Sequence, residues 1–260
     1  MISMTRAHRR RLLMVVAAAV AAAVVGGLGL TVLVGSSEPY TRHSAHPVQD
    51  EHMPPGLDIT FRWPSTPVLD PQSSEGTFVR AWVESFELAT AGASPAWGYP
   101  GFVEAAPSNI DQMITAYPTE VTPDRRQVGT AFYTGLRRVD DVDRTRIILC
   151  RHGYRSVQHA GRWAIGFDTP RPVEIDIRRV GDEPSAAPRG GERTPGTDVF
   201  GGWYTSRYDF AALYPTPTAD QKACDATTPA ALPRWLPTED DQPWPTAPSV
   251  PGWSAYPGAV

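Results

Sequence analysis

The stretch RTRIILCRHGYRSV, residues 144–157, holds a continuous apolar core followed by Gly153. Such a run is typical of a strand buried in a sheet, and the glycine indicates a bulge or a bend. Side chains two positions apart in a strand share a face, so Cys150 and His152 are expected on the same side. The chain has only one other cysteine, Cys224, in a different segment. We therefore expect this strand and the two cysteines to determine how the parts of the domain are held together.

The N-terminal part of the chain resembles a membrane anchor. Four arginines in residues 1–11 precede 23 uncharged residues, 12–34. As an α-helix of about 1.5 Å per residue, this segment would span roughly 34 Å, against a hydrocarbon core of about 30 Å. The alternative is a cleaved signal peptide, whose apolar region is normally about 7–15 residues long. We predict a transmembrane helix over 12–34, with residues 1–11 in the cytoplasm and the rest extracytoplasmic, so the lipid bilayer is one partner.

Charge limits the other partners. Residues 1–11 hold four of the 24 basic residues and no acidic residue, so the outer part has 20 basic residues against 28 acidic ones, a net charge of −8. An acidic exterior without a basic cluster argues against nucleic acid as a partner. Solubility alone is sufficient to explain the excess.

The predicted topology also bears on the cysteines. Outside the membrane, two cysteines in one chain usually form a disulfide. A bond between Cys150 and Cys224 would close a loop of about 75 residues and stabilise the fold by roughly 4 kcal/mol. A metal pair and a catalytic thiol are the alternatives, but the short ligand spacing of a zinc site is missing. We expect a structural disulfide.

Proline-rich segments flank the predicted domain. The chain has 27 prolines, about twice the usual share. Residues 35–72 are expected to form an extended stalk, in which LDITFRW (57–63) adds a short edge strand or docks on the domain. His43, His46 and His52 lie in this stalk, but a flexible segment offers no fixed geometry for a metal, so no metal site is predicted.

The central part of the chain, residues 73–228, shows a helical pattern first. Apolar residues in the stretch SSEGTFVRAWVESFELATAG (73–92) recur on one face, and Arg80, Glu84 and Glu87 occupy the opposite side. Ser74 is a candidate N-cap, and Gly92 is a stop signal. A short second helix follows, capped by Ser108 and ended by Pro118. Its apolar residues are Ile110, Met113, Ile114 and Tyr117.

After Pro123 the period changes from helical to two. Strands are predicted within QVGTAFYTGLRRV (127–139), TRIILCRHGYRSV (145–157), GRWAIGFD (161–168), PVEIDIRRV (172–180) and VFGGWYTSRYDF (199–210). A loop of about 18 residues separates the last two. The expected fold is α+β, with an N-terminal transmembrane helix, helices packed on a curved antiparallel sheet, and a proline-rich C-terminal tail.

The tail, residues 229–260, spaces Trp235, Trp244 and Trp253 nine residues apart. These tryptophans are candidate contacts for a partner or for the cell wall, because a polyproline-like segment with regular aromatics can dock in a groove. Two other interpretations remain open: the tryptophans fold back over the sheet edge of their own domain, or the tail is disordered.

The order of the predicted elements resembles the nuclear transport factor 2-like superfamily, cystatin-like α+β domains in which helices pack into a curved sheet. More narrowly, it is similar to actinobacterial membrane-anchored extracytoplasmic proteins with this fold. The stretches TFVRAWVESF (77–86), RIILC (146–150) and GGWYTSRYDF (201–210) carry the resemblance. It implies an accessory or assembly role in a secretion or conjugation-like envelope complex, and it also implies that some relatives are enzymes.

The first function predicted is therefore a non-catalytic accessory protein that contacts other envelope proteins. The alternative is a small-ligand-binding protein or an isomerase or dehydratase that uses a cone-shaped pocket. Its candidate pocket residues are Tyr133, His152, Tyr154 and Asp168, since such enzymes use an Asp, His or Tyr as acid or base. None of the four falls in a catalytic motif, so we predict no catalytic residue and no cofactor.

Overall fold

The computed structural model describes residues 53–116, 121–122, 124–185, 190–209 and 218–254. The predicted transmembrane segment 12–34 and the stalk histidines lie outside the described residues. Within the described part of the chain, no helix is long and apolar enough to cross a bilayer. The predicted α+β architecture is confirmed, since one sheet is combined with a few helices.

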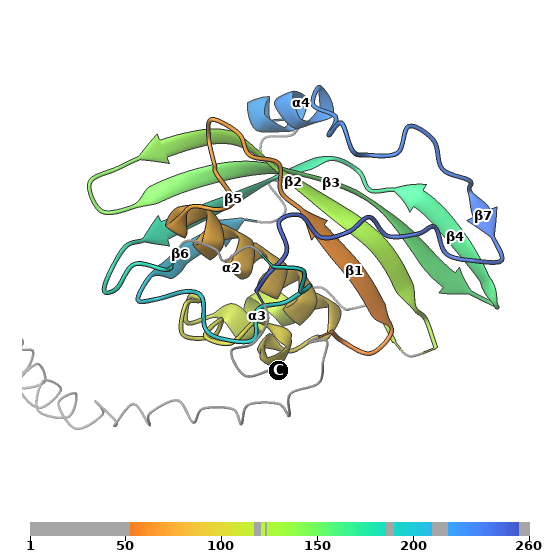
Figure 1. The fold of residues 1–260 in the computed structure, drawn as a ribbon, viewed down its shortest axis with the longest axis horizontal. Helices are drawn as coiled ribbons and strands as arrows, with labels where there is room; N and C mark the ends of the chain where they lie inside the picture. Colours follow the sequence, from red (N-terminus) through yellow and green to blue (C-terminus); the bar gives the residue numbers. More distant parts are fainter. Residues whose placement is uncertain (1–52, 117–120, 123, 186–189, 210–217, 255–260) are drawn as a thin grey trace, which may run out of the picture. The chain divides into compact units, whose positions relative to one another are not determined.

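Seven strands form the sheet within the described residues (Figure 1). They are β1 (Leu57–Arg62), β2 (Gln127–Asp140), β3 (Thr145–His159), β4 (Arg162–Phe167), β5 (Arg171–Arg178), β6 (Tyr204–Asp209) and β7 (Glu239–Asp240). The long strand β3 is the centre of the sheet: it pairs with β2 along its length, with β5 near its start and with β4 near its end. The pairs are antiparallel except β1 with β2, which are parallel.

In the part of the chain that the structure describes, four helical segments accompany the sheet. They are α2 (Ser74–Ala91), the 3-10 turn η1 (Pro95–Trp97), α3 (Ile110–Thr115) and α4 (Ala219–Asp225). Helices α2 and α3 lie on one side of the sheet and α4 on the other (Figure 1). The N-cap of α2 is Ser73, whose side chain accepts from the Gly76 amide, so the cap lies one residue before the expected one. Asn109, not Ser108, precedes α3, and its side chain makes no capping bond.

Alternation along the strands produces two apolar layers. On β3, Ile147 and Leu149 face α2 and belong to the main core, together with Trp82 and Phe86 of the helix. Side chains of the opposite face, such as Phe132 and Tyr154, form a smaller core with Trp163 and Leu236. The C-terminal segment covers this second core, so both faces of the sheet are buried.

Cys150 lies on the face of β3 opposite to α2 and forms a disulfide with Cys224 of α4. The predicted disulfide is therefore confirmed. Both cysteines are almost fully buried. The bond fastens the short helix α4, which has little apolar surface of its own, to the centre of the sheet.

The folded region is larger than expected. Phe61, Trp63 and Leu69 are buried in the main core, so the segment from residue 57 onward is part of the domain, and the stalk expected up to residue 72 ends earlier. The reason is that β1 pairs with β2 at the edge of the sheet, one of the two roles foreseen for LDITFRW. Residues 239–253 also belong to the domain.

Residues 239–253, which we call the C-terminal strap, cross the sheet and turn around its β1 edge (Figure 1). The strap starts as β7 beside β4, and its Trp244 amide donates to Ser156 Oγ on β3 at 2.9 Å. Ala247 N then donates to Thr130 Oγ1 on β2 at 2.9 Å, and Val250 bridges to Arg62 at the end of β1. The strap thus protects an edge strand that would otherwise be open to pairing.

The strap ends with Trp253 inserted against α2, where it is 1% exposed. Its indole nitrogen donates to Glu84 Oε2 at 2.9 Å, and Arg80 lies over its ring at 4.1 Å. Trp63 Nε1 and Tyr99 OH donate to the same carboxylate, each at 2.7 Å. Burial raises the pKa of Glu84, while Arg80 and these donors oppose that rise. We call these five residues the Glu84 cluster.

The Glu84 cluster corrects the prediction for the polar face of the helix. Arg80 and Glu84 were expected on the side away from the core, yet both are buried. The helical pattern is right, but the strap and the segment after β1 cover that face. Burial of this pair is tolerated because each charged group has a partner of opposite charge or several hydrogen bonds.

Candidate functional site

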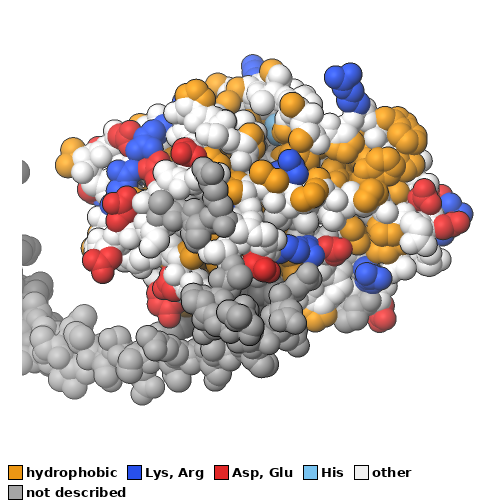
Figure 2. Space-filling model, viewed as in Figure 1, with side chains coloured by type: hydrophobic (Ala, Val, Ile, Leu, Met, Phe, Trp, Pro, Cys, Tyr) orange, Lys and Arg blue, Asp and Glu red, His pale blue; other side chains and the backbone are white. Residues whose placement is uncertain are grey.

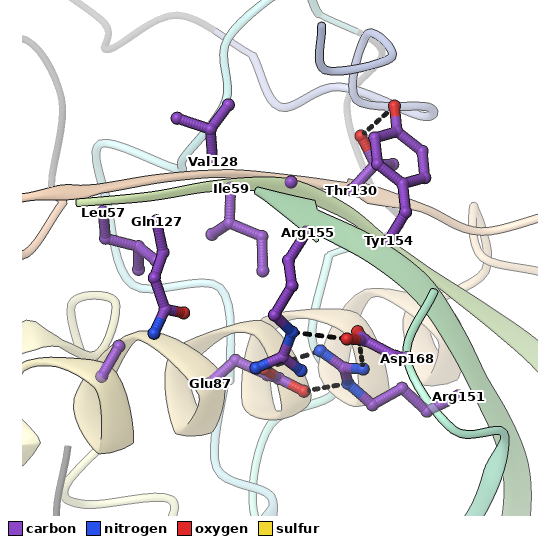
Figure 3. A pocket seen from close by; sticks show the side chains of 12 residues that line it. Leu57, Ile59, Glu87, Gln127, Val128, Thr130, Arg151, Tyr154, Arg155 and Asp168 are labelled. Atoms are coloured by element: carbon purple, nitrogen blue, oxygen red, sulfur yellow. Dashed lines mark hydrogen bonds and ion pairs between the residues drawn. The ribbon is translucent and has the colours of Figure 1, made fainter. Parts of the chain in front are cut away.

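A second group of charged side chains lies between α2 and the sheet (Figure 3). Glu87 of α2 pairs with Arg151 of β3, with Nη2 and Oε2 3.3 Å apart. Arg151 Nη1 also donates to Asp168 Oδ2 at 2.6 Å, and Tyr133 OH donates to Glu87 Oε1 at 2.5 Å. Arg155 Nε donates to the other oxygen of Asp168. We call these five residues the Arg151 cluster.

Strand alternation brings the cluster together. Arg151 and Arg155 are an even number of residues apart on β3, so both face α2. Asp168 follows β4 directly, and its amide donates to the carbonyl of Gly153 at 2.9 Å. A Cβ at position 153 would lie 2.7 Å from Asp168 Oδ2 and 2.9 Å from the Thr130 carbonyl oxygen. The glycine therefore makes room for Asp168 between two arginines. The bulge that the sequence suggested at Gly153 is not found there, because the register shift between β2 and β3 lies between Gly135 and Arg137.

The surrounding charges and burial hold Glu87, Asp168 and Tyr133 each in one protonation state at neutral pH. Burial favours the neutral form of Glu87, but the charges of Arg151 and Arg171 outweigh it and lower the pKa of Glu87 to about 2. The pKa of Asp168 is lowered in the same way by Arg151 and Arg155, against the effect of burial. Burial and the nearby Glu87 charge raise the pKa of Tyr133 well above its ordinary value. A general acid or base works best with a pKa near neutrality, and these three groups do not have one.

A cavity of about 60 Å³ adjoins the cluster. Its lining residues are Leu57, Ile59, Glu87, Ala91, Gln127, Val128, Gly129, Thr130, Arg151, Tyr154, Arg155 and Asp168. Pockets for substrates and cofactors are generally about 300–1,000 Å³. A cavity of this volume has room for a few water molecules or for one small chemical group.

The structure separates the four predicted pocket residues. Tyr133 and Asp168 lie in the Arg151 cluster, connected through Glu87 and Arg151. The side chains of His152 and Tyr154 point to the opposite face, as Figure 3 shows for Tyr154. Tyr154 OH donates to the carbonyl of Pro245 in the strap at 2.9 Å. The four residues therefore do not line one pocket, because Tyr133 and Asp168 lie on the α2 side of the sheet, whereas His152 and Tyr154 extend from the opposite face of β3.

His152 lies on the disulfide side of β3 and is almost fully buried. Burial lowers the pKa of its imidazole, opposed by nearby backbone groups of Thr227 and Cys224. Cys150 and His152 share a face, as expected, but the cysteine is oxidised in the disulfide. A thiol–imidazole pair is therefore not available for nucleophilic chemistry here.

Three members of the Arg151 cluster were not foreseen from the sequence: Glu87, Arg151 and Arg155. Glu87 was placed on the outer side of the helix, and the arginines were overlooked because they follow an apolar run. Alternation from Ile147 and Leu149 would have placed Arg151 on the core face, where an arginine requires a carboxylate partner. Elsewhere, the described residues contain no group of three or more His, Cys, Asp or Glu side chains placed to hold a metal ion.

The tail tryptophans also differ from one another. Trp253 is buried in the Glu84 cluster, while Trp235 is 68% exposed. Trp244 lies against Trp235, with the ring centroids 6.2 Å apart and nearly perpendicular. Figure 2 shows hydrophobic side chains gathered where the segment between α4 and β7 crosses the sheet.

Comparisons of the chain with protein-family models, with curated proteins and with solved structures find no match. The fold and the two clusters define an α+β domain fastened by one disulfide and by buried ion pairs.

Proposed function

We propose that the protein is a non-catalytic, membrane-anchored accessory or assembly protein of a cell-envelope complex, with its domain outside the cytoplasm. The Arg151 cluster carries this proposal. Its carboxylates are ion-paired to arginines, its acidic groups have pKa values far from neutrality, and its cavity is small. Such a cluster stabilises a fold better than it transfers protons.

The disulfide supports the extracytoplasmic location. Disulfides persist in oxidising compartments and are rare in the cytosol. Together with the apolar segment 12–34 and the arginines before it, the bond between Cys150 and Cys224 favours a single-pass anchor with the N-terminus inside. We propose that this anchor precedes a domain of the nuclear transport factor 2-like kind, on the basis of the order of helices and strands.

Contact with an envelope partner is the second element of the proposal. Trp235 supports it, since an exposed tryptophan beside a second tryptophan is typical of a contact surface. Trp253 is not a candidate, because it is already used inside the domain. Binding of a cell-wall component at the same place is the alternative.

Photocrosslinking in intact cells tests the role. A photoreactive amino acid at position 235 should capture one discrete neighbouring protein, while the same group at the exposed position 142, between β2 and β3, should not. If the protein is recovered from both strains as an uncrosslinked monomer, the assembly role is wrong. A fluorescent fusion at the C-terminus and thiol labelling without reductant test the location, and a bright cytosolic fusion with two reactive thiols would contradict it.

A further inference from the structure

Arg155 lines the cavity, and its guanidinium group has more hydrogen-bond donors than it uses within the described structure. It reaches Asp168 through Nε only. Within the described residues, its two terminal nitrogens have no hydrogen-bond partner, and 43% of its side chain is exposed to solvent. The planar fork of an arginine matches the two oxygens of a carboxylate, so these nitrogens form an unfilled anion-binding edge.

Arg155 has no carboxylate of its own among the charged groups that line the cavity. Two arginines, Arg151 and Arg155, line the cavity together with two carboxylates, Glu87 and Asp168, and Arg171 lies outside this lining. Arg151 is buried and pairs with both carboxylates, and Arg171 approaches Glu87 at 3.7 Å. Arg155 thus shares an acid that Arg151 already neutralises. One added negative charge beside Arg155 would give this arginine a counter-charge that it does not share.

The other residues that line the cavity determine which chemical group fits beside Arg155. Leu57, Ile59 and Ala91 provide apolar surface, and Figure 3 shows Gln127, Ile59 and Arg155 on the same side of the sheet. Gly129 pairs with Arg155 across β2 and β3. A Cβ at position 129 would lie 3.3 Å from Arg155 Cβ, so the glycine leaves space in the cavity beside the arginine. The volume of about 60 Å³ excludes a large ligand.

From these features we propose that the cavity beside Arg155 binds a single carboxylate on a short apolar group. The carboxylate contacts the terminal nitrogens of Arg155, and the apolar group lies against Leu57 and Ile59. Two sources provide this chemistry: a free short-chain acid and the C-terminal carboxylate of a peptide. The site requires neither the membrane anchor nor an envelope partner, so it stands or falls independently of the proposed function.

Ligand-detected NMR on the full chain in mild detergent tests the site. Propionate should give a saturation-transfer signal, and the uncharged isostere propionamide should not. A dipeptide with a free C-terminus, compared with its amidated form, distinguishes the sources. If only the free dipeptide binds, the ligand is a chain end; if propionate binds as well, a free acid is sufficient. Absence of a signal from both carboxylates, or equal signals from acid and amide, would overturn the proposal.

Two variants and a control locate the binding. Arg155→Gln should weaken propionate binding about tenfold, because the charge-assisted bonds are lost. Ala91→Leu fills the cavity without changing any charge and should weaken binding similarly. Arg162→Gln is the matched control, an arginine with 55% of its side chain exposed that pairs with Glu239 at 2.8 Å, and it should bind like the wild type. Equal weakening in the control, or unchanged binding in both variants at an unchanged melting temperature, would contradict the assignment.

Discussion

Glu84 is the residue on which distant parts of the chain converge. Its carboxylate accepts hydrogen bonds from Trp63, Tyr99 and Trp253, and its charge offsets that of the buried Arg80. These partners come from the segment after β1, the loop after η1, the end of the strap and the same helix. One carboxylate therefore couples elements that no local sequence signal connects.

Replacing this carboxylate should be costly. Glu84→Gln presents an NH₂ donor to groups that are themselves donors and leaves Arg80 without a counter-charge. We expect a loss of about 3 kcal/mol in the free energy of unfolding, measured by urea denaturation. Glu104→Gln, at an exposed position, should change it by less than about 0.5 kcal/mol. Similar effects of the two substitutions would show that the cluster contributes little.

Gly153 offers a test of the Arg151 cluster. Gly153→Ala places a methyl group 2.7 Å from Asp168 Oδ2 and 2.9 Å from a backbone oxygen. Asp168 must then move away from Arg151, at a cost of about 2 kcal/mol. Gly166→Ala on β4 is the control, since nothing lies within 4 Å of its added Cβ. If both variants melt at the temperature of the wild type, Gly153 has no role in placing Asp168.

The pKa of Glu87 makes a prediction about pH. A carboxyl whose pKa falls from 4.5 in the unfolded chain to about 2 in the folded one stabilises the fold above pH 4.5 and loses that effect as the pH drops toward 2. A pKa difference of one corresponds to about 1.4 kcal/mol, so ionised Glu87 contributes about 3 kcal/mol to the free energy of unfolding. The stability difference between wild type and Glu87→Gln should therefore shrink over this interval. A constant difference from pH 7 to pH 2 would contradict it.

At the scale of elements, the sequence pattern is most informative where burial follows a simple period. In β5, Val173, Ile175 and Ile177 face the core as the alternation predicts. The apolar stripe of α2 is equally clear, and its boundaries are nearly those expected. The edge strand β1 was foreseen only as one option, because its pairing with β2 joins residues about 70 positions apart.

The same helix shows where sequence reasoning fails. Arg80 and Glu84 have the spacing of a solvent-exposed face, and they are buried by distant residues such as Trp63 and Trp253, the latter 169 residues from Glu84. For the site, chemistry alone grouped Tyr133 and Asp168 with His152 and Tyr154. The two sides of β3 separate these pairs, so the side of the sheet has to be considered together with the residue type.

Helix α4 depends on its covalent attachment. The loop closed by Cys150 and Cys224 has a sequence separation of 74, which corresponds to a stabilisation of about 4 kcal/mol in the chain-entropy account. A double variant with alanine at both positions should lose up to that amount in urea denaturation. Reductant should lower the stability of the wild type to the same level and leave the variant unchanged. If the fully reduced wild type unfolds at the original midpoint, the disulfide does not stabilise the domain.

At the scale of the whole molecule, the domain is closed by its two ends. The edge strand β1 comes from the start of the described region, and the strap comes from its end and passes around β1. The proline-rich composition that suggested a tail serves a different purpose here: an extended segment without a regular fold of its own can follow the surface of the sheet. Within the described part of the tail, residues 229–254, the large aromatic side chain that stays exposed is that of Trp235.

The central claim is that the strap is an integral part of the domain. Thermal unfolding of two tryptophan variants tests it most directly. Trp253→Ala should cost about 3–5 kcal/mol, because it removes a buried ring and a donor to Glu84. Trp235→Ala, at a position 68% exposed, should change stability by less than about 0.5 kcal/mol. Equal melting temperatures for Trp253→Ala and the wild type would contradict the claim and make the tail a free arm.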